Sequence, residues 1–154
     1  MNSTTSMLLR FREIEIKDYK QVTNLLSQLS EVGNIKEHDF VLLLIKLRAN
    51  HKIICCEYND IESNETKIIG MGTLLLEYKI IHNFGIVAHI EDIVVDKNYR
   101  NLQVGKKLIN HLIQLSKDKN AYKIILNCNE KNIGFYEKCG FYKNEVEMRL
   151  DINA

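Results

Sequence analysis

Two adjacent carboxylates stand in a stretch whose other residues belong in a protein core. The stretch covers residues 89–95, HIEDIVV, and the acids are Glu91 and Asp92. Successive side chains of a strand point to opposite faces, so the pair shares one face only where a β-bulge intervenes. Because burying an unpaired carboxylate is costly, we predict that this strand borders a cleft in which the acids hold polar groups of a ligand. The alternative is a strand that crosses an exposed edge of the sheet.

A polar turn follows at residues 96–103 and runs directly into a stretch of helical periodicity that starts near Val104. The free N–H groups at a helix N-terminus and the positive end of the helix dipole suit a phosphate or diphosphate. Gly105 lets a ligand approach the backbone closely, and Arg100 and Lys106 add positive charge. No GxxxxGKS/T motif is present, which argues against a P-loop. The alternative is an ordinary basic helix start.

The third candidate is Tyr136, which lies in residues 135–141, FYEKCGF. A phenol can donate a proton to a leaving group as negative charge builds on it. The alternative is an aromatic residue of the core, which is what we expect of Phe135 and Phe141. Cys139 lies close by in the sequence, but no histidine at a suitable spacing supports a nucleophilic role for it.

Strands and helices in a definite order must position these residues. Apolar runs predict strands over residues 8–14, 52–58, 67–79, 87–95, 122–128 and 144–152, and helical spacing predicts helices over residues 17–30, 37–48, 104–120 and 132–140. This order, β-α-α-β-β-β-α-β-α-β, predicts an α/β protein with a mixed sheet and helices on its faces. Strand 122–128 is nearly all apolar, so we expect it to be buried on both faces. The helix residues expected to face the core are Tyr19, Val22, Leu25, Leu26, Leu29, Phe40, Leu43, Leu44, Leu47, Val104, Leu108, Leu112 and Leu115.

Length and composition narrow the class of protein. The chain has 154 residues, enough for one domain with a sizeable core, and we expect residues 1–7 to be a flexible leader. A formal net charge of +1 argues against nucleic acid as a partner. No apolar run reaches the length of a membrane span, and no secretory signal is expected. The four cysteines form no CxxC pair, which predicts reduced thiols in a cytoplasmic protein without a metal site.

In this order and at this spacing, HIEDIVV, YRNLQVGKKLI and FYEKCGF resemble the core of the GNAT superfamily of acetyl-CoA-dependent N-acetyltransferases. KIIH, HIEDIVV, YKIIL and NIGFYEKCGF together resemble the glucosamine-6-phosphate N-acetyltransferases within it. The resemblance implies one GNAT domain over residues 8–154, with a mixed, mostly antiparallel sheet splayed between two strands and helices on both faces. It also implies direct transfer of acetyl from acetyl-CoA to the amine of glucosamine 6-phosphate, in the biosynthesis of UDP-N-acetylglucosamine, with no metal.

The resemblance assigns roles residue by residue. Tyr136 would donate a proton to the leaving thiolate, while Glu91 and Asp92 would hold the sugar and orient its amine. The residues implied to contact coenzyme A are Ile93, Val94, Val95, Arg100, Asn101, Leu102, Gln103, Val104, Gly105, Lys106, Asn132 and Tyr136. Those implied to contact the sugar phosphate are Glu31, Lys79, Ile80, Ile81, His82, Glu91, Asp92, Ile93, Tyr122, Lys123, Asn127 and Arg149. Tyr122 and Lys123 would reach in from the partner subunit of a homodimer.

The chain departs from the family pattern at three positions. Gln103 replaces the first glycine of the segment that binds the diphosphate, and Asn127 stands where the family often has an acid. Asp151 follows Arg149 near the end of the last strand, where the family commonly places an arginine. Two other functions remain open: a GNAT enzyme acting on a protein N-terminus, a lysine or a polyamine, and a non-catalytic module that binds coenzyme A.

Overall fold

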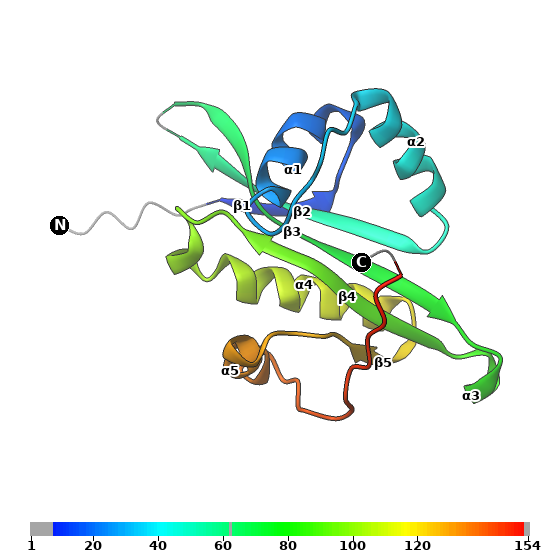
Figure 1. The fold of residues 1–154 in the computed structure, drawn as a ribbon. Helices are drawn as coiled ribbons and strands as arrows, with labels where there is room; N and C mark the ends of the chain where they lie inside the picture. The colour runs from blue at the N-terminus through cyan, green and yellow to red at the C-terminus, as the bar shows by residue number, and fades with distance from the viewer. Residues whose placement is uncertain (1–7, 62, 153–154) are drawn as a thin grey trace.

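An open five-stranded sheet organises the part of the chain that the computed structural model describes, residues 8–61 and 63–152 (Figure 1). The predicted leader, residues 1–7, lies outside these residues. The strands run in the order β1-β2-β3-β4-β5 and are β1 Leu9–Glu13, β2 His51–Asp60, β3 Glu65–Tyr78, β4 Ile86–Val95 and β5 Ala121–Ile125. The first three pairings are antiparallel and the last, β4 with β5, is parallel. The predicted mixed, mostly antiparallel sheet is therefore confirmed.

Helices cover both faces of the sheet (Figure 1). One face carries α1 Tyr19–Leu26 and α2 Glu37–Leu47, and the other carries α4 Val104–Asp118 and α5 Ile133–Glu137, while α3 Ile81–Phe84 is a short turn between β3 and β4. Single 3₁₀ turns precede α1, α4 and α5, at Ile16–Asp18, Arg100–Leu102 and Glu130–Asn132. Cys55 and Cys56 point to opposite faces and join different core clusters, as strand alternation requires.

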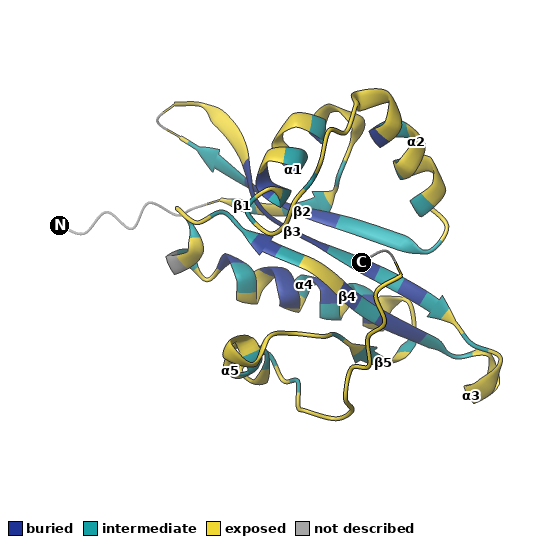
Figure 2. Ribbon diagram, viewed as in Figure 1, coloured by how far each residue is buried: buried dark blue, intermediate teal, exposed yellow. Residues whose placement is uncertain are grey.

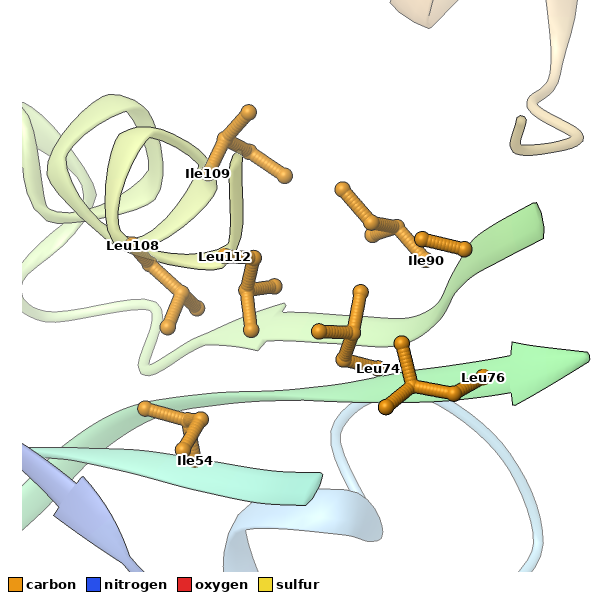
Figure 3. Packing of buried hydrophobic residues seen from close by; sticks show 8 residues of the cluster. Ile54, Leu74, Leu76, Ile90, Leu108, Ile109 and Leu112 are labelled. Atoms are coloured by element: carbon orange, nitrogen blue, oxygen red, sulfur yellow. The ribbon is translucent and has the colours of Figure 1, made fainter. Parts of the chain in front are cut away.

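The largest core cluster lies between α4 and the middle of the sheet. Figure 3 shows Leu108, Ile109 and Leu112 of α4 facing Leu74 and Ile90 of the sheet, and all five are buried. Burying a side chain of this size contributes about 1.5–3 kcal/mol. Because this helix also begins at the predicted anion-binding turn, the core that anchors α4 also positions that turn.

Three helices differ from the prediction, one of them α5, which ends at Glu137 rather than at residue 140. Helix α1 ends at Leu26 rather than at residue 30, so Leu29 lies beyond it and is exposed. In α2 only Phe40 is buried, and Leu43, which we expected to face the core, is 47% exposed. Since α2 is apolar on nearly every side, its periodicity does not define a single inward stripe, and the tertiary contact through Phe40 decides which side packs.

The C-terminal end differs more. Residues 142–152 form no strand, and their alternating apolar side chains are exposed, Met148 to 91% (Figure 2). Strand β5 ends at Ile125 and is not buried on both faces, since Tyr122 is 41% exposed. Both predictions were wrong: within the described residues β5 pairs only with β4 and residues 142–152 pair with no strand, so this segment and the outer edge of β5 stay open.

Candidate active site

A β-bulge in β4 puts both carboxylates on the surface. The register with β3 passes from Thr73–Glu91 to Met71–Val94, so that Gly72 faces two residues, Asp92 and Ile93. Asp92 has a φ of +51°, and it is exposed together with Glu91 in the middle of an otherwise covered strand (Figure 2). A Cβ on Gly72 would lie 2.4 Å from Cδ1 of Ile93, so glycine leaves the space that Ile93 needs at the bulge.

Strands β4 and β5 separate after a short contact. Their pairing covers only Ile86–His89, and β4 continues to Val95 with no partner on that side among the described residues. A cleft of about 760 Å³ opens where the strands part, with Ile93, Val94 and Val95 on one side and Asn132 and Tyr136 on the other. An unpaired strand edge offers N–H and C=O groups to an extended ligand.

One end of the cleft is the start of α4. Arg100, Gln103, Gly105 and Lys106 line it, and the N–H groups of the first helical turn have no partner within the helix. Arg100 Nε donates a 3.3 Å hydrogen bond to the carbonyl of Val95, which ties the 3₁₀ turn to the unpaired strand. The result is a positive, donor-rich end that suits a diphosphate.

The other residues that we expected to contact coenzyme A at this end of the cleft contribute less to its lining. Val104 is fully buried in the core and Leu102 packs against the same cluster, so only their backbones are available to a ligand. The side chain of Asn101 lies outside what the structure describes. Gln103 adopts the left-handed conformation, with φ +57° and ψ +19°, and its side chain makes no cap hydrogen bond to α4.

Tyr136 occupies the wall of the cleft opposite β4. Its ring packs edge-on against Phe135 and Phe141, at centroid distances of 5.0 Å and 6.1 Å. Burial raises the pKa of Tyr136, and the neighbouring thiols of Cys128 and Cys139 act in the same direction. The phenol is therefore protonated at neutral pH and can act as a donor toward the cleft.

A second group of predicted residues meets at the start of β4. The rings of His82 and Tyr122 are in contact, tilted by 38° with centroids 4.5 Å apart, and Lys123 Nζ lies 5.8 Å from the Tyr122 ring centroid. Lys79 pairs with Glu77, which also bonds His89 Nε2 at 2.8 Å. Lys123 lies opposite Val87, and the strand rises about 13 Å from Val87 to Glu91, so Lys123 and Tyr122 lie one strand segment away from the paired carboxylates, with His89 between them.

The remaining predicted residues are scattered over the surface. Ile80, Ile81, Glu31 and Asn127 are exposed, and Arg149 donates to Asp151 in the exposed C-terminal segment. The cleft also has lining residues that the motifs did not indicate: Gln28, Leu29, Lys131, Phe135, Lys138 and Cys139. No local sequence signal could have indicated Gln28, because it is a polar residue in a turn. Only the tertiary structure brings it to the cleft.

Other kinds of site are not found in the part of the chain that the structure describes. No group of three or more His, Cys, Asp or Glu residues there is arranged to hold a metal ion. No helix among those residues has the length and apolar character needed to cross a bilayer.

A splayed mixed sheet, an unpaired β4 edge and an anion-binding start of α4 define a GNAT-type acetyltransferase. The Acetyltransferase (GNAT) family matches residues 12–141. Glucosamine 6-phosphate N-acetyltransferase of Arabidopsis thaliana is 34% identical over 143 residues, covering 90% of this chain and 93% of its own length. Glucosamine 6-phosphate N-acetyltransferase 1 of Dictyostelium discoideum is 36% identical over 151 residues, covering 97% of this chain and 95% of its own length. The chain belongs to the family of glucosamine 6-phosphate N-acetyltransferases.

Solved structures agree with this assignment. The crystal structure of the Arabidopsis thaliana enzyme matches with a TM-score of 0.86 and 33% identity, over 95% of this chain and 99% of that one. An acetyltransferase of Clostridium acetobutylicum solved with acetyl-CoA shares the fold, with a TM-score of 0.71 at 14% identity over 94% of this chain and 97% of that one.

Proposed function

We propose that this protein transfers acetyl from acetyl-CoA to the amine of glucosamine 6-phosphate, giving N-acetylglucosamine 6-phosphate and CoA on the route to UDP-N-acetylglucosamine. The observation that carries the proposal is the cleft where β4 parts from β5. It joins an unpaired strand edge, an anion-binding helix start and a half-buried tyrosine in one groove. The names of the relatives that match nearly the whole chain support an amino-sugar phosphate as acceptor.

The lining of the cleft fits coenzyme A by its chemistry. The edge formed by Ile93, Val94 and Val95 can hydrogen-bond the amides of the pantetheine arm as an added strand would. The start of α4, with Arg100 and Lys106, suits the diphosphate. Acetyl-CoA supplies the activated acetyl group, and the remaining chemistry falls to the side chains of this protein.

Tyr136 is proposed to donate its proton to the sulfur as the thiol leaves. The raised pKa of Tyr136, caused by burial, keeps that proton in place at neutral pH. Glu91 and Asp92, both exposed at the bulge, would hold sugar hydroxyls and orient the amine. A sugar amine near the α-amino pKa of about 7.7–8.0 is partly neutral at physiological pH, so water or Asp92 can take its proton, while a main-chain carbonyl near Asn127 can accept a hydrogen bond from it.

We also propose a homodimer in which the partner completes the acceptor site. In one copy Lys123 and His82 lie near the start of β4, away from Asp92, and a second copy can bring its Lys123 and His82 to the carboxylates. The segment 142–152 and the outer edge of β5 are both unpaired within the described chain. Pairing this segment with β5 of a second copy would bury alternating apolar side chains and close an open edge.

A cytoplasmic location is part of the same proposal. Cys55, Cys56, Cys128 and Cys139 are all free thiols, and unpaired cysteines are usual in reducing compartments. Burial raises the pKa of Cys55 to about 11 and that of Cys56 to about 12, so these two thiols are unreactive at neutral pH.

A panel of acceptors with acetyl-CoA tests the function. Thiol release is measured with glucosamine 6-phosphate, glucosamine, spermidine and peptide amines. We expect the highest kcat/KM with glucosamine 6-phosphate, and a higher value with spermidine or a peptide would identify a different GNAT acceptor. CoA binding without thiol release from any acceptor would favour a non-catalytic module.

A further inference from the structure

The turn between β4 and the 3₁₀ helix before α4 is built around Asp96. Its backbone N–H donates to the carbonyl of Ile69 at 2.8 Å, and its carbonyl accepts from Tyr99 N at 2.8 Å. One carboxylate oxygen, Oδ1, accepts from Asn98 N at 2.8 Å. This turn connects the unpaired edge of β4 with the donors at the start of α4, so its shape sets the distance between the two halves of the cleft.

Gln28 holds this turn from the opposite side of the cleft. Its Nε2 donates to Oδ2 of Asp96 at 3.1 Å, and its Oε1 accepts from Lys97 N at 3.0 Å. The nitrogen and the oxygen of one side-chain amide thus bind two consecutive residues, and both are far from Gln28 in the sequence. Gln28 follows α1, lines the cleft that also contains Arg100 and Gln103, and precedes the segment of Glu31.

We propose that Gln28 is a positioning residue for the binding of coenzyme A, an inference that rests on the proposed function. When the side-chain amide of Gln28 is removed, Lys97 N loses its acceptor and the Asp96 carboxylate loses a donor. The carboxylate is then free to turn toward the cleft, where its negative charge opposes a diphosphate, and the turn gains conformational freedom that binding must remove. Gln28 acts through the turn and need not touch the ligand.

Calorimetric titration of CoA, without acceptor, tests the proposal on the full chain. Gln28→Ala is expected to weaken binding about fivefold to tenfold, since the two hydrogen bonds of Gln28 support the bound geometry only in part. Gln28→Glu should weaken it at least as much, because it places a second carboxylate against Asp96. Adding Asp96→Asn to Gln28→Glu restores a donor–acceptor pair with the same total charge, and the affinity should return to within about threefold of the wild type.

Gln21, on the helix that Gln28 follows, provides a control. Its Oε1 accepts a single long-range hydrogen bond from Ile68 N at 2.9 Å, and Gln21 does not line the cleft. Gln21→Ala should lower the stability and leave CoA affinity unchanged, while Gln28→Ala should raise the KM for acetyl-CoA and leave kcat unchanged. Any of three results would overturn the inference. They are a wild-type CoA affinity in Gln28→Ala, an equal loss of CoA affinity in Gln21→Ala, and a double variant whose CoA affinity does not recover. A wild-type protein that binds no CoA would instead refute the proposed function.

Discussion

Replacing Gln103 by glycine should stabilise this protein. Gln103 has φ +57° and ψ +19°, and its side chain makes no cap hydrogen bond to α4. The left-handed conformation costs a residue with a Cβ about 1–2 kcal/mol, and glycine avoids this cost. Glycine also has more conformational entropy in the unfolded chain, which lowers the free energy of unfolding by about 0.4–1 kcal/mol. The net gain for Gln103→Gly is therefore at most about 1.6 kcal/mol and centred on about 0.8 kcal/mol, or about 2–3 °C in Tm for a chain of this size.

Urea denaturation of three proteins measures the effect. Gln103→Ala removes the same side-chain amide but keeps the Cβ and the strained backbone, so it should be no more stable than the wild type. Gln103→Gly should exceed Gln103→Ala by about 1 kcal/mol, with an acetyl-CoA KM that does not rise, because the proposed donors are backbone N–H groups. A glycine variant no more stable than the alanine variant would refute the reasoning about strain.

Three further results are expected. Tyr136→Phe should lower kcat about 10²-fold with little change in the KM for acetyl-CoA, and unchanged turnover would remove Tyr136 from its proposed role. Lys123→Ala should raise the KM for glucosamine 6-phosphate more than that for glucosamine, and equal effects would mean that Lys123 does not bind the phosphate. Burial alone would raise the pKa of Asp18, but hydrogen bonds from Arg12 and from Glu15 N lower it. Its stabilisation is therefore complete above the unfolded pKa of about 3.9 and is lost as pH falls through the lower folded value. As the pH is lowered from 7 to 3, the free energy of unfolding should fall less steeply in Asp18→Asn than in the wild type, and parallel curves would contradict this.

The first four predicted strands and the long helix α4 agree with the structure because their signals are local. Alternation in HIEDIVV and helical spacing from Val104 onward each belong to one element. The adjacent acids likewise required either a bulge or two opposite faces, and the structure has the bulge, with Asp92 at positive φ. The structure also shows what the pattern did not contain, which is the dependence of that bulge on the missing Cβ of Gly72.

Burial and long-range contacts could not be predicted in the same way. The apolar residues of α2, of β5 and of residues 142–152 satisfy a helix or strand pattern equally well whether they are covered or exposed. Leu43 and Tyr122 were predicted to be buried and are not. Gln28 carries no motif, and it meets Asp96 and Lys97 only because α1 ends beside the turn that follows β4.

The amino-acid sequence by itself determined the elements, the acidic pair, the glycine and cations near the start of α4, and the tyrosine opposite them, since each depends on residues close together in the chain. Only the tertiary structure decided that β4 leaves β5 after His89, that a cleft opens there, and that Gln28 holds the turn beside it. The physical reason is that a cleft is set by where packed elements fail to meet, and this depends on contacts between residues far apart in the chain.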